Sequence, residues 1–275
     1  MRLNAISKLG VLLGIATLLA GCGGSGNGVR NDRLYIMFYD DVNDENVLAS
    51  ISSAQPGNVA VIGSFSYLSN SIFGLDRRPA NDGLYVYSGD DNRLLRINAS
   101  NGTHSIVGQN DQDPAMPVGT DFNPVADRLR VVNTADLNFR INPDTGVTAG
   151  VDTNLNPDSD IADIAYTNNQ AGAVTTTLYG IDRVDGNLVR IGGIDGTPSA
   201  NGGVVTVVGP LGLVFGPDDT VWFDVDENGN AWMLAGFWNG LEDENELYSV
   251  NLTTGAATFV GTVNNNMEMV GMTAR

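Results

Sequence analysis

Short runs of alternating apolar and polar residues, each ended by a turn, recur along most of the chain. The clearest example is Gly119 to Gly146, where three such runs follow one another closely. They cover residues 120–123, 128–133 and 137–141, and a Pro-containing turn and an Asp-Thr-Gly turn separate or close them. Alternation with a period of two between turn residues predicts short antiparallel strands.

Other segments repeat this unit at a spacing of about 45 to 53 residues. Each copy has an apolar-aromatic strand, a second strand that runs into a Gly turn, and a third strand that, except in the third copy, ends in Val-Gly or Ile-Gly. The first of these strands begins near Arg33, Gly83, Arg128, Thr177 and Asn230. A period of this length with about four strands in each unit is typical of a β-propeller.

A leading strand precedes four of the five copies. These leading strands are Phe73–Arg77, Thr120–Asn123, Ile161–Tyr166 and Val221–Val225. The C-terminal segment Val270–Ala274 resembles the first of them, so we expect it to complete the first copy and close a ring. The prediction is an all-β propeller of five four-stranded blades. Six blades are the nearest alternative, if the insert between Gly192 and Gly203 contains strands.

Several of these segments also resemble a known family. They are D-F-N-P-x-x-D-R-x-R at 121–130, N-F-R-I-N-P-D-T-G at 138–146, A-Y-T-N at 165–168 with T-L-Y at 177–179, and L-D-R-R-P-A at 75–80. Together they resemble an uncharacterised bacterial family, domain of unknown function forty-three ninety-four, which is grouped with β-propellers. The resemblance covers nearly all of the mature chain, although L-D-R-R-P departs slightly from the family's I-D-F-R-P. It implies a fold and brings no activity.

The N-terminus has the pattern of an export signal. A segment with Arg2 and Lys8 precedes the apolar run Leu9–Ala20, which is too short to span a bilayer comfortably. The following Leu-Ala-Gly-Cys resembles the lipobox of bacterial lipoproteins, which implies cleavage before Cys22 and diacylglycerol on its sulfur. We therefore expect a signal peptide at 1–21, a Gly-rich tether at 22–30 and a single propeller domain at 31–275.

Acylation of Cys22 would anchor the protein to a lipid bilayer. Gly23 follows the cysteine, where an Asp would resemble an inner-membrane retention signal. The outer membrane is therefore favoured if the host has one. We expect the protein to be a monomer without a disulfide, since Cys22 is the only cysteine.

The net charge limits the partners. The sequence has 32 acidic and 14 basic residues, and its only lysine, Lys8, lies in the predicted signal peptide. A surface with a net charge of −18 repels phosphate, which argues against binding nucleic acid. It is compatible with cations, cationic partners or neutral glycans, and equally with solubility in a salty medium.

Few reactive side chains remain in the mature chain. One histidine, one cysteine and no lysine exclude a His-Cys zinc site, a Schiff-base lysine and a dithiol. His104 lies where a turn enters a strand, and we expect it to be a solvated bystander. Any chemistry must use carboxylates, arginines and the backbone.

Each leading strand carries an aspartate, and these four should lie near the axis of the ring. They are Asp76, Asp121, Asp163 and Asp224, with Thr273 in the closing strand. One interpretation is a polar ring around an axial ligand or cation. The other is structural, with each carboxylate paired to an arginine across the blade interface. The candidate arginines are Arg77, Arg78, Arg128, Arg130 and Arg140, and Asp121 with Arg128 is the expected clamp.

A possible calcium loop follows the last leading strand. Asp224, Asp226 and Asn228 with Gly229 match the first half of a D-x-D-x-N-G loop. The twelfth position is Ala235, so the bidentate acid is missing, and an ordinary acidic turn is the alternative. We expect no other cofactor.

Three functions fit the sequence. The first is a non-catalytic lipoprotein that binds a protein or glycan on one rim, with Trp222, Trp232, Phe237 and Trp238 as the local supply of aromatic side chains. The second is a carboxylate-based hydrolase such as a glycosidase, which needs two carboxyl groups about 5 to 9.5 Å apart. The third is a structural protein of the cell envelope.

Overall fold

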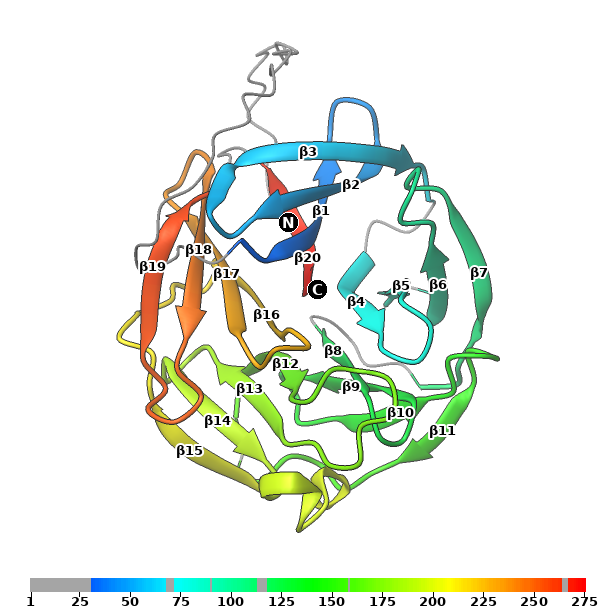
Figure 1. Cartoon of the computed structure of the whole chain (residues 1–275), viewed down its shortest axis with the longest axis vertical. Helices are drawn as coiled ribbons and strands as arrows, with labels where there is room; N and C mark the ends of the chain where they lie inside the picture. Colours follow the sequence, from blue (N-terminus) through cyan, green and yellow to red (C-terminus); the bar gives the residue numbers. More distant parts are fainter. Residues whose placement is uncertain (1–30, 68–71, 90, 113–117, 158, 264–266) are drawn as a thin grey trace, which may run out of the picture.

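The computed structural model describes residues 31–67, 72–89, 91–112, 118–157, 159–263 and 267–275, in which five antiparallel four-stranded sheets form a ring (Figure 1). This confirms the predicted five-bladed propeller. The predicted signal peptide, the tether and Cys22 lie outside the described residues. Within them, no helix has the length and apolar character needed to cross a bilayer.

The blades are numbered in chain order, and their strands are given from the axis outward. Blade 1 consists of β20 (Glu268–Ala274), β1 (Arg33–Asp40), β2 (Glu45–Ser52) and β3 (Gln55–Phe65). Blade 2 consists of β4 (Ile72–Arg78), β5 (Gly83–Ser88), β6 (Arg93–Ile97) and β7 (His104–Gln109). Blade 3 consists of β8 (Val118–Asn123), β9 (Arg128–Asn133), β10 (Asn138–Ile141) and β11 (Thr148–Val151). Blade 4 consists of β12 (Ile161–Tyr166), β13 (Leu178–Asp182), β14 (Asn187–Ile191) and β15 (Val205–Pro210). Blade 5 consists of β16 (Thr220–Val225), β17 (Ala231–Trp238), β18 (Asp243–Val250) and β19 (Ala257–Thr262).

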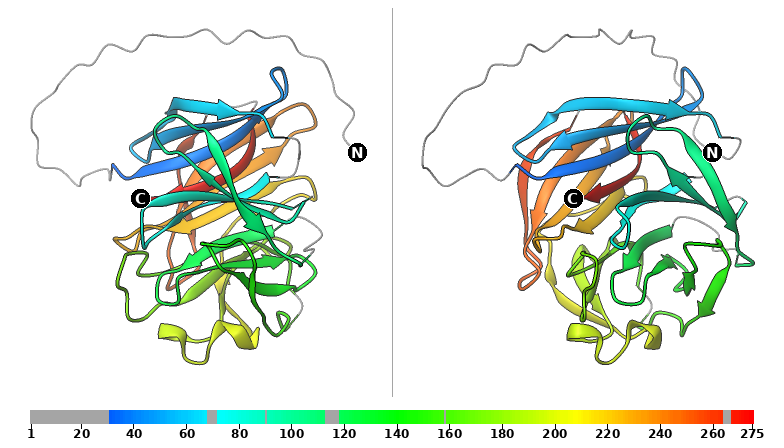
Figure 2. Two further views of the ribbon diagram at one scale, coloured as in Figure 1. Left: turned by 90° about the vertical axis from the view of Figure 1, so that its right-hand side faces the viewer. Right: turned by 45° about the vertical axis from the view of Figure 1, so that its right-hand side comes forward.

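The ring is closed as predicted, by the last strand pairing with the first. β20 lies antiparallel to β1, with Thr273 opposite Tyr35, and the amide of Arg275 donates to the carbonyl of Arg33 at 3.0 Å (Figure 2). The insert after β14 forms two short 3₁₀ turns, η1 (Ile194–Gly196) and η2 (Ala200–Gly202). It therefore adds no sixth blade.

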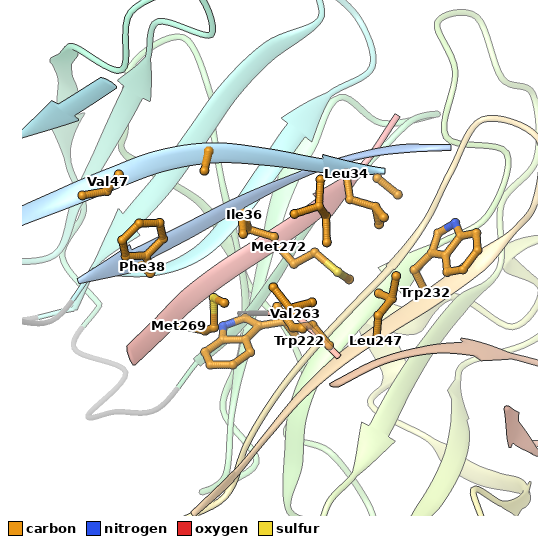
Figure 3. Close-up of a cluster of buried hydrophobic side chains, with 14 residues drawn as sticks. Leu34, Ile36, Phe38, Val47, Trp222, Trp232, Leu247, Val263, Met269 and Met272 are labelled. Carbon is orange, nitrogen blue, oxygen red and sulfur yellow. The ribbon is translucent and has the colours of Figure 1, made fainter. Parts of the chain in front are cut away.

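Apolar side chains fill the spaces between blades. Each blade packs between two others, so strands such as β5 are buried on both faces, whereas the outer strand β7 is largely exposed. Between blades 1 and 5 the cluster includes Trp222, Trp232 and Met272 (Figure 3). The two tryptophans are only 8% and 4% exposed, so they belong to the core and not to a binding rim.

Two sequence motifs, the glycine that ends the outer strand and the glycine of the Asn-Gly or Thr-Gly turn, meet between neighbouring blades. A Cβ on Gly63 would lie 1.9 Å from the carbonyl oxygen of Asn101, and Gly102 packs against Gly63 with a φ of +73°. Only glycine fits both positions. The same contact joins Gly108 to Gly146 and Gly209 to Gly255.

Candidate functional site

The four leading-strand aspartates form a ring of hydrogen bonds around the axis. The inner strands β4, β8, β12, β16 and β20 lie at the edges of their sheets, so some of their backbone amides have no partner strand. A buried amide needs an acceptor. In four of the five inner strands, one of these amides donates to an aspartate of the preceding blade.

Each of the four aspartates accepts from one amide of the next inner strand. Asp76 Oδ2 accepts from Phe122 N at 2.6 Å, Asp121 Oδ2 from Tyr166 N, Asp163 Oδ2 from Phe223 N at 2.9 Å, and Asp224 Oδ2 from Ala274 N at 2.7 Å. Thr273 completes the ring, because its Oγ1 lies 2.8 Å from Asp224 Oδ2 and 3.2 Å from Asp76 Oδ1. The carboxylates therefore connect all five blades.

The predicted pairing of these aspartates with arginines is wrong. Among the described residues, no arginine side chain forms a hydrogen bond or ion pair with any of the four carboxylates. Arg128 donates to the carbonyl oxygen of Asp127 instead of clamping Asp121. The partners of these carboxylates across the blade interface are therefore backbone amides of the neighbouring blade and not guanidinium groups.

Asp163 does not occupy the position that matches the other three. Asp76, Asp121 and Asp224 each accept from the amide that follows the matching position of the next inner strand. Asp163 instead accepts from the amide of Phe223, which precedes the matching position, Asp224. Since Tyr166 follows Ala165, Ala165 takes the matching position in β12. Asp163 therefore lies at a different level of the axis.

Three carboxylates converge as a result. Asp76, Asp121 and Asp224 each offer an oxygen such that all three oxygens lie within 4.8 Å of one another, and all three residues are at most 3% exposed. Asp121 Oδ1 has no hydrogen-bond partner among the described residues. These are the residues that could hold a metal ion.

Burial raises the pKa of all four aspartates, because a charged carboxylate is poorly solvated in the interior. For Asp121 the pKa rises well above its usual value, and the negative charges of Asp76 and Asp224 add to the effect of burial. For Asp224 burial and the charge of Asp76 raise the pKa to about 8.

A loop of blade 4 lies across one end of the axis. Asn169, between β12 and β13, is fully buried, and its Nδ2 donates to the carbonyl of Val225 in blade 5 at 3.1 Å. Its own carbonyl accepts from Arg77 Nη2 of blade 2 at 3.1 Å, while Arg77 Nη1 bonds to Asp82 at 2.5 Å. The hydrogen-bonded residues Asn169 and Arg77 thus cover the axial carboxylates at this end of the axis.

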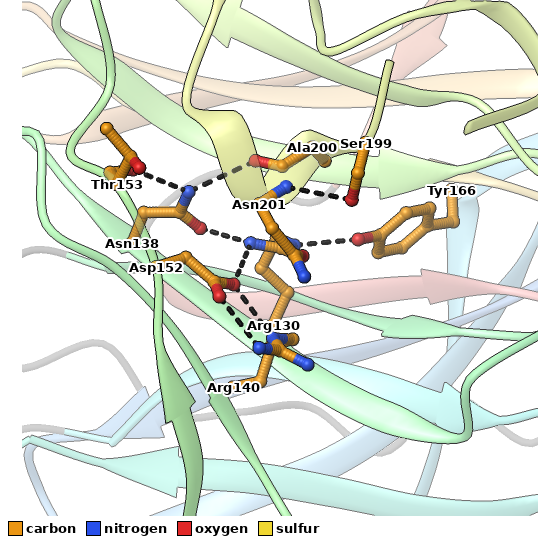
Figure 4. A network of polar contacts seen from close by, with 9 residues as sticks. All are labelled: Arg130, Asn138, Arg140, Asp152, Thr153, Tyr166, Ser199, Ala200 and Asn201. Atoms are coloured by element: carbon orange, nitrogen blue, oxygen red, sulfur yellow. Dashed lines mark hydrogen bonds and ion pairs between the residues drawn. The ribbon is translucent and has the colours of Figure 1, made fainter. Parts of the chain in front are cut away.

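Three other predicted arginines bind acids outside the axial ring. Arg78 of blade 2 bonds to Asp127 and Asp144 of blade 3. Arg130, 1% exposed, bonds to the Tyr166 hydroxyl at 2.7 Å, and it shares Asp152 with Arg140 (Figure 4). These networks join blades and hold the insert that contains η2.

The predicted calcium loop is split between two sets of partners. Asp224 faces the axis, whereas Asp226 caps its own turn through the amides of Asn228 and Asn230, at 2.9 and 2.8 Å, and the side chain of Asn230. Those bonds are the ones expected of an acidic turn. Calcium binding by this loop stays a prediction.

His104 is less solvated than expected. Its ring centroid lies 4.8 Å from that of Phe65 and 5.3 Å from that of Tyr67. Burial lowers the pKa of this histidine, so the neutral imidazole is favoured.

An aromatic cluster that the sequence showed only in part lies at the junction of blades 4 and 5. The rings of Phe215 and Phe237 are stacked, with centroids 5.9 Å apart, and Trp238 donates its amide to Asp219 at 2.9 Å. Arg183 Nη1 donates to the carbonyl oxygen of Asp219 at 3.1 Å. All five residues are partly exposed, and we call them the aromatic rim. Phe215, Arg183 and Asp219 were missed because their segments carry no repeat motif.

Comparison with solved structures shows likeness of fold. The GH43 protein BlXynB from Bacillus licheniformis matches with a TM-score of 0.52 and 11% identity, over 83% of this chain and 52% of that one, so the chain spans about half of its length. A chain of a nidogen/laminin complex matches with a TM-score of 0.48 and 13% identity, over 87% and 84% of the two chains. A protein from Lactobacillus plantarum matches with a TM-score of 0.46 and 13% identity, over 89% and 85%.

Comparison with known sequences places the chain in a family. No curated protein matches it. A family model described as "Domain of unknown function (DUF4394)" matches residues 47–273, which is most of the chain and nearly all of the ring. The chain therefore belongs to this family, as the resemblance of its motifs implied.

Proposed function

We propose that this protein is an exported lipoprotein, anchored in the membrane through Cys22, whose propeller binds a protein or glycan partner without catalysing a reaction. The observation that carries the proposal is the aromatic rim, which combines partly exposed Phe and Trp side chains with an Arg and an Asp. Aromatic and arginine side chains are the residues most enriched at the centres of binding interfaces.

Exposed aliphatic side chains extend this surface. Val214 and Leu241, on the connections next to Phe215 and Trp238, are 90% and 85% exposed. Acidic side chains nearby are also exposed, among them Asp218 on the β15–β16 connection and Glu244 at the start of β18. An apolar surface with acidic surroundings suits a partner that presents apolar and basic groups, and we therefore favour a protein over a glycan.

The rim lies at the end of blade 5 opposite to the point where the described chain begins. Asp32, close to the start of β1, lies 3.4 Å from Asn230 through their side chains, and Asn230 immediately precedes β17. Trp238 is at the other end of that strand, roughly 24 Å away at about 3.4 Å per residue. A chain anchored through the segment before Asp32 would therefore present the rim on the side away from the tether.

The test uses the full-length protein, purified in detergent, and three charge substitutions. Val214→Asp and Leu241→Asp place a charge on the rim side. Val174→Asp is the matched control, because Val174 is 86% exposed and lies on the β12–β13 loop, at the opposite end of the blades. A partner captured from envelope extract by the wild type should be retained by the control and lost by both rim variants.

Several results would contradict the proposal. One is a set of captured proteins that is the same for the wild type and the rim variants; another is the absence of any reproducible partner together with no signal on a glycan array. A glycan signal that the rim variants abolish would support binding and identify the partner as a glycan. Cys22→Ser should move the protein out of the membrane fraction if Cys22 is the anchor.

A carboxylate-based hydrolase is the less supported alternative. The axial carboxylates have the raised pKa values that a catalytic acid needs. However, these residues are at most 4% exposed, and each carboxylate accepts a hydrogen bond from a backbone amide of the next inner strand. Their burial and bonding support the binding function over hydrolysis.

A further inference from the structure

The convergence of Asp76, Asp121 and Asp224 leaves one polar atom unexplained. Asp76 and Asp224 use both oxygens in hydrogen bonds, including bonds to the amide of the residue that follows each of them. Asp121 cannot repeat this arrangement, because the following amide, that of Phe122, donates to Asp76. Its Oδ1 is therefore left without a donor in a residue that is 1% exposed.

We propose that the carboxylates of Asp76, Asp121 and Asp224 form a calcium site on the axis of the propeller. The three residues come from blades 2, 3 and 5, so one ion would connect blades that are distant in sequence. Carboxylate oxygen is the preferred ligand of this hard cation. Asp121, one of the three converging carboxylates, has a buried oxygen that is free to act as a ligand.

Charge balance favours a cation here. Three buried carboxylates near one another are unfavourable unless something neutralises them. The guanidinium of Arg77, the residue after Asp76, is bonded to Asp82 and to the carbonyl of Asn169. It is therefore not bonded to the cluster, and a bound cation would offset the charge of the ionised carboxylates.

The burial of the cluster favours calcium over magnesium. Ca²⁺ takes about six to eight oxygen ligands in flexible geometry, whereas Mg²⁺ usually keeps several of its waters. The three residues are at most 3% exposed, so a ligand set of protein oxygens suits the site better than one of retained waters. Thr273 Oγ1, bonded to two of the carboxylates, is close enough to take part.

Asp163 provides a matched control within the same ring. Its Oδ1 accepts from the amides of Thr120 and Ile164, at 3.1 and 2.9 Å, and its Oδ2 accepts from Phe223. Both oxygens are thus occupied by backbone donors, and the residue lies outside the cluster of three. Asp163→Asn should weaken the fold without removing a calcium ligand.

The experiment compares full-length wild type, Asp121→Asn and Asp163→Asn, purified in detergent and dialysed at physiological salt. Elemental analysis should find about one calcium per chain in the wild type and in Asp163→Asn. Thermal unfolding of both should shift to higher temperature with added Ca²⁺ and to lower temperature with a chelator, and Mg²⁺ should have a smaller effect. Asp121→Asn should bind calcium at least about tenfold more weakly, because it lacks one charged ligand.

If Asp121→Asn does not fold, the measurements on the wild type alone still test the proposal. No bound calcium and an unchanged unfolding temperature with Ca²⁺ or chelator would overturn the proposal and indicate a cluster that shares protons. Calcium that is retained in folded Asp121→Asn, or lost equally in folded Asp163→Asn, would also overturn it, since the ion would then be bound elsewhere. Neither outcome affects the binding function proposed for the rim.

Discussion

Replacing Arg130 by methionine tests whether the buried polar network between blades 3 and 4 stabilises the ring. The guanidinium of Arg130 bonds to Tyr166, Asn138, Asp152 and Asn201. Methionine has a similar length and no donor. The variant therefore keeps most of the volume and removes every one of these hydrogen bonds.

The expected loss of stability follows from what each partner has left. Asp152 keeps Arg140, at 2.8 and 2.7 Å, so it is not left as an unpaired charge. The side-chain oxygens of Asn138, which is buried, and Asn201, which is partly exposed, lose a charged donor, and each buried group left unsatisfied costs about 1 to 3 kcal/mol. We expect a decrease of about 4 kcal/mol in the free energy of unfolding, within the range for breaking a buried pair.

Arg140→Met is the comparison. The side chain of Arg140 is 25% exposed, and Asp152 would keep Arg130 at 3.0 Å. Its loss should cost about 1 kcal/mol or less, as for partly exposed ion pairs. The assay is equilibrium unfolding in guanidinium chloride followed by tryptophan fluorescence. In a thermal scan the Arg130→Met variant should melt roughly 8 to 16 °C lower, at about 2 to 4 °C for each kcal/mol.

The reasoning is refuted if the two variants differ by less than about 1 kcal/mol, or if Arg140→Met is the more harmful of the two, because burial and the number of unsatisfied partners are then not what determines stability here. A change in the slope of the denaturant dependence would show that the variant no longer unfolds in the same transition. The comparison is therefore made only between curves of equal slope.

Two further predictions concern the surface and the contacts between blades. Gly63→Ala places a Cβ 1.9 Å from a backbone oxygen of blade 2, and it should lower the free energy of unfolding in urea by about 2 to 3 kcal/mol. Gly202→Ala is the control and should be close to neutral, because its Cβ would meet nothing within 4 Å. Equal losses of stability in the two variants would contradict this account of the repeat glycines. The hydrogen bond of Tyr39 to Asp44, 2.5 Å long, raises the pKa of the tyrosine to about 12. The hydrogen bond therefore stabilises the folded protein fully below about pH 10, the pKa of an unfolded tyrosine, and this stabilisation is lost as the pH rises through about 12. In the ultraviolet titration, Asp44→Asn should move one of the late phenolates back towards 10 and leave those of Tyr67 and Tyr248 late, and an unchanged titration would exclude the hydrogen bond as the cause.

The ring could be predicted from the sequence because its signals are local. Strand alternation, turn glycines and a regular period each require only a short segment, and the C-terminal strand resembles Phe73–Asp76 closely enough to identify closure. The aspartates of the inner strands were also found this way. Even the offset of Asp163 is visible, since its place among the apolar residues of β12 differs from that of Asp121 in β8.

The partners of these residues could not be predicted in the same way. Whether an edge amide needs an acceptor depends on the strand of the next blade, and a sequence motif does not contain that information. The same limit applies to Trp222 and Trp232, which resemble binding residues until blade 1 covers them. The prediction of the aromatic rim was incomplete for the same reason, because Phe215 meets Phe237 only after the sheet of blade 5 forms.

The closure of blade 1 also determines how the protein would respond to mechanical force. The described chain begins just before β1, which lies between β2 and β20 and is hydrogen-bonded to both. Hydrogen bonds in an antiparallel sheet are perpendicular to the strands, so a pull at Arg33 along β1 loads the bonds on both sides together instead of opening them one after another. A tether that enters the ring at this strand would therefore pull on the part of the fold best arranged to resist shear.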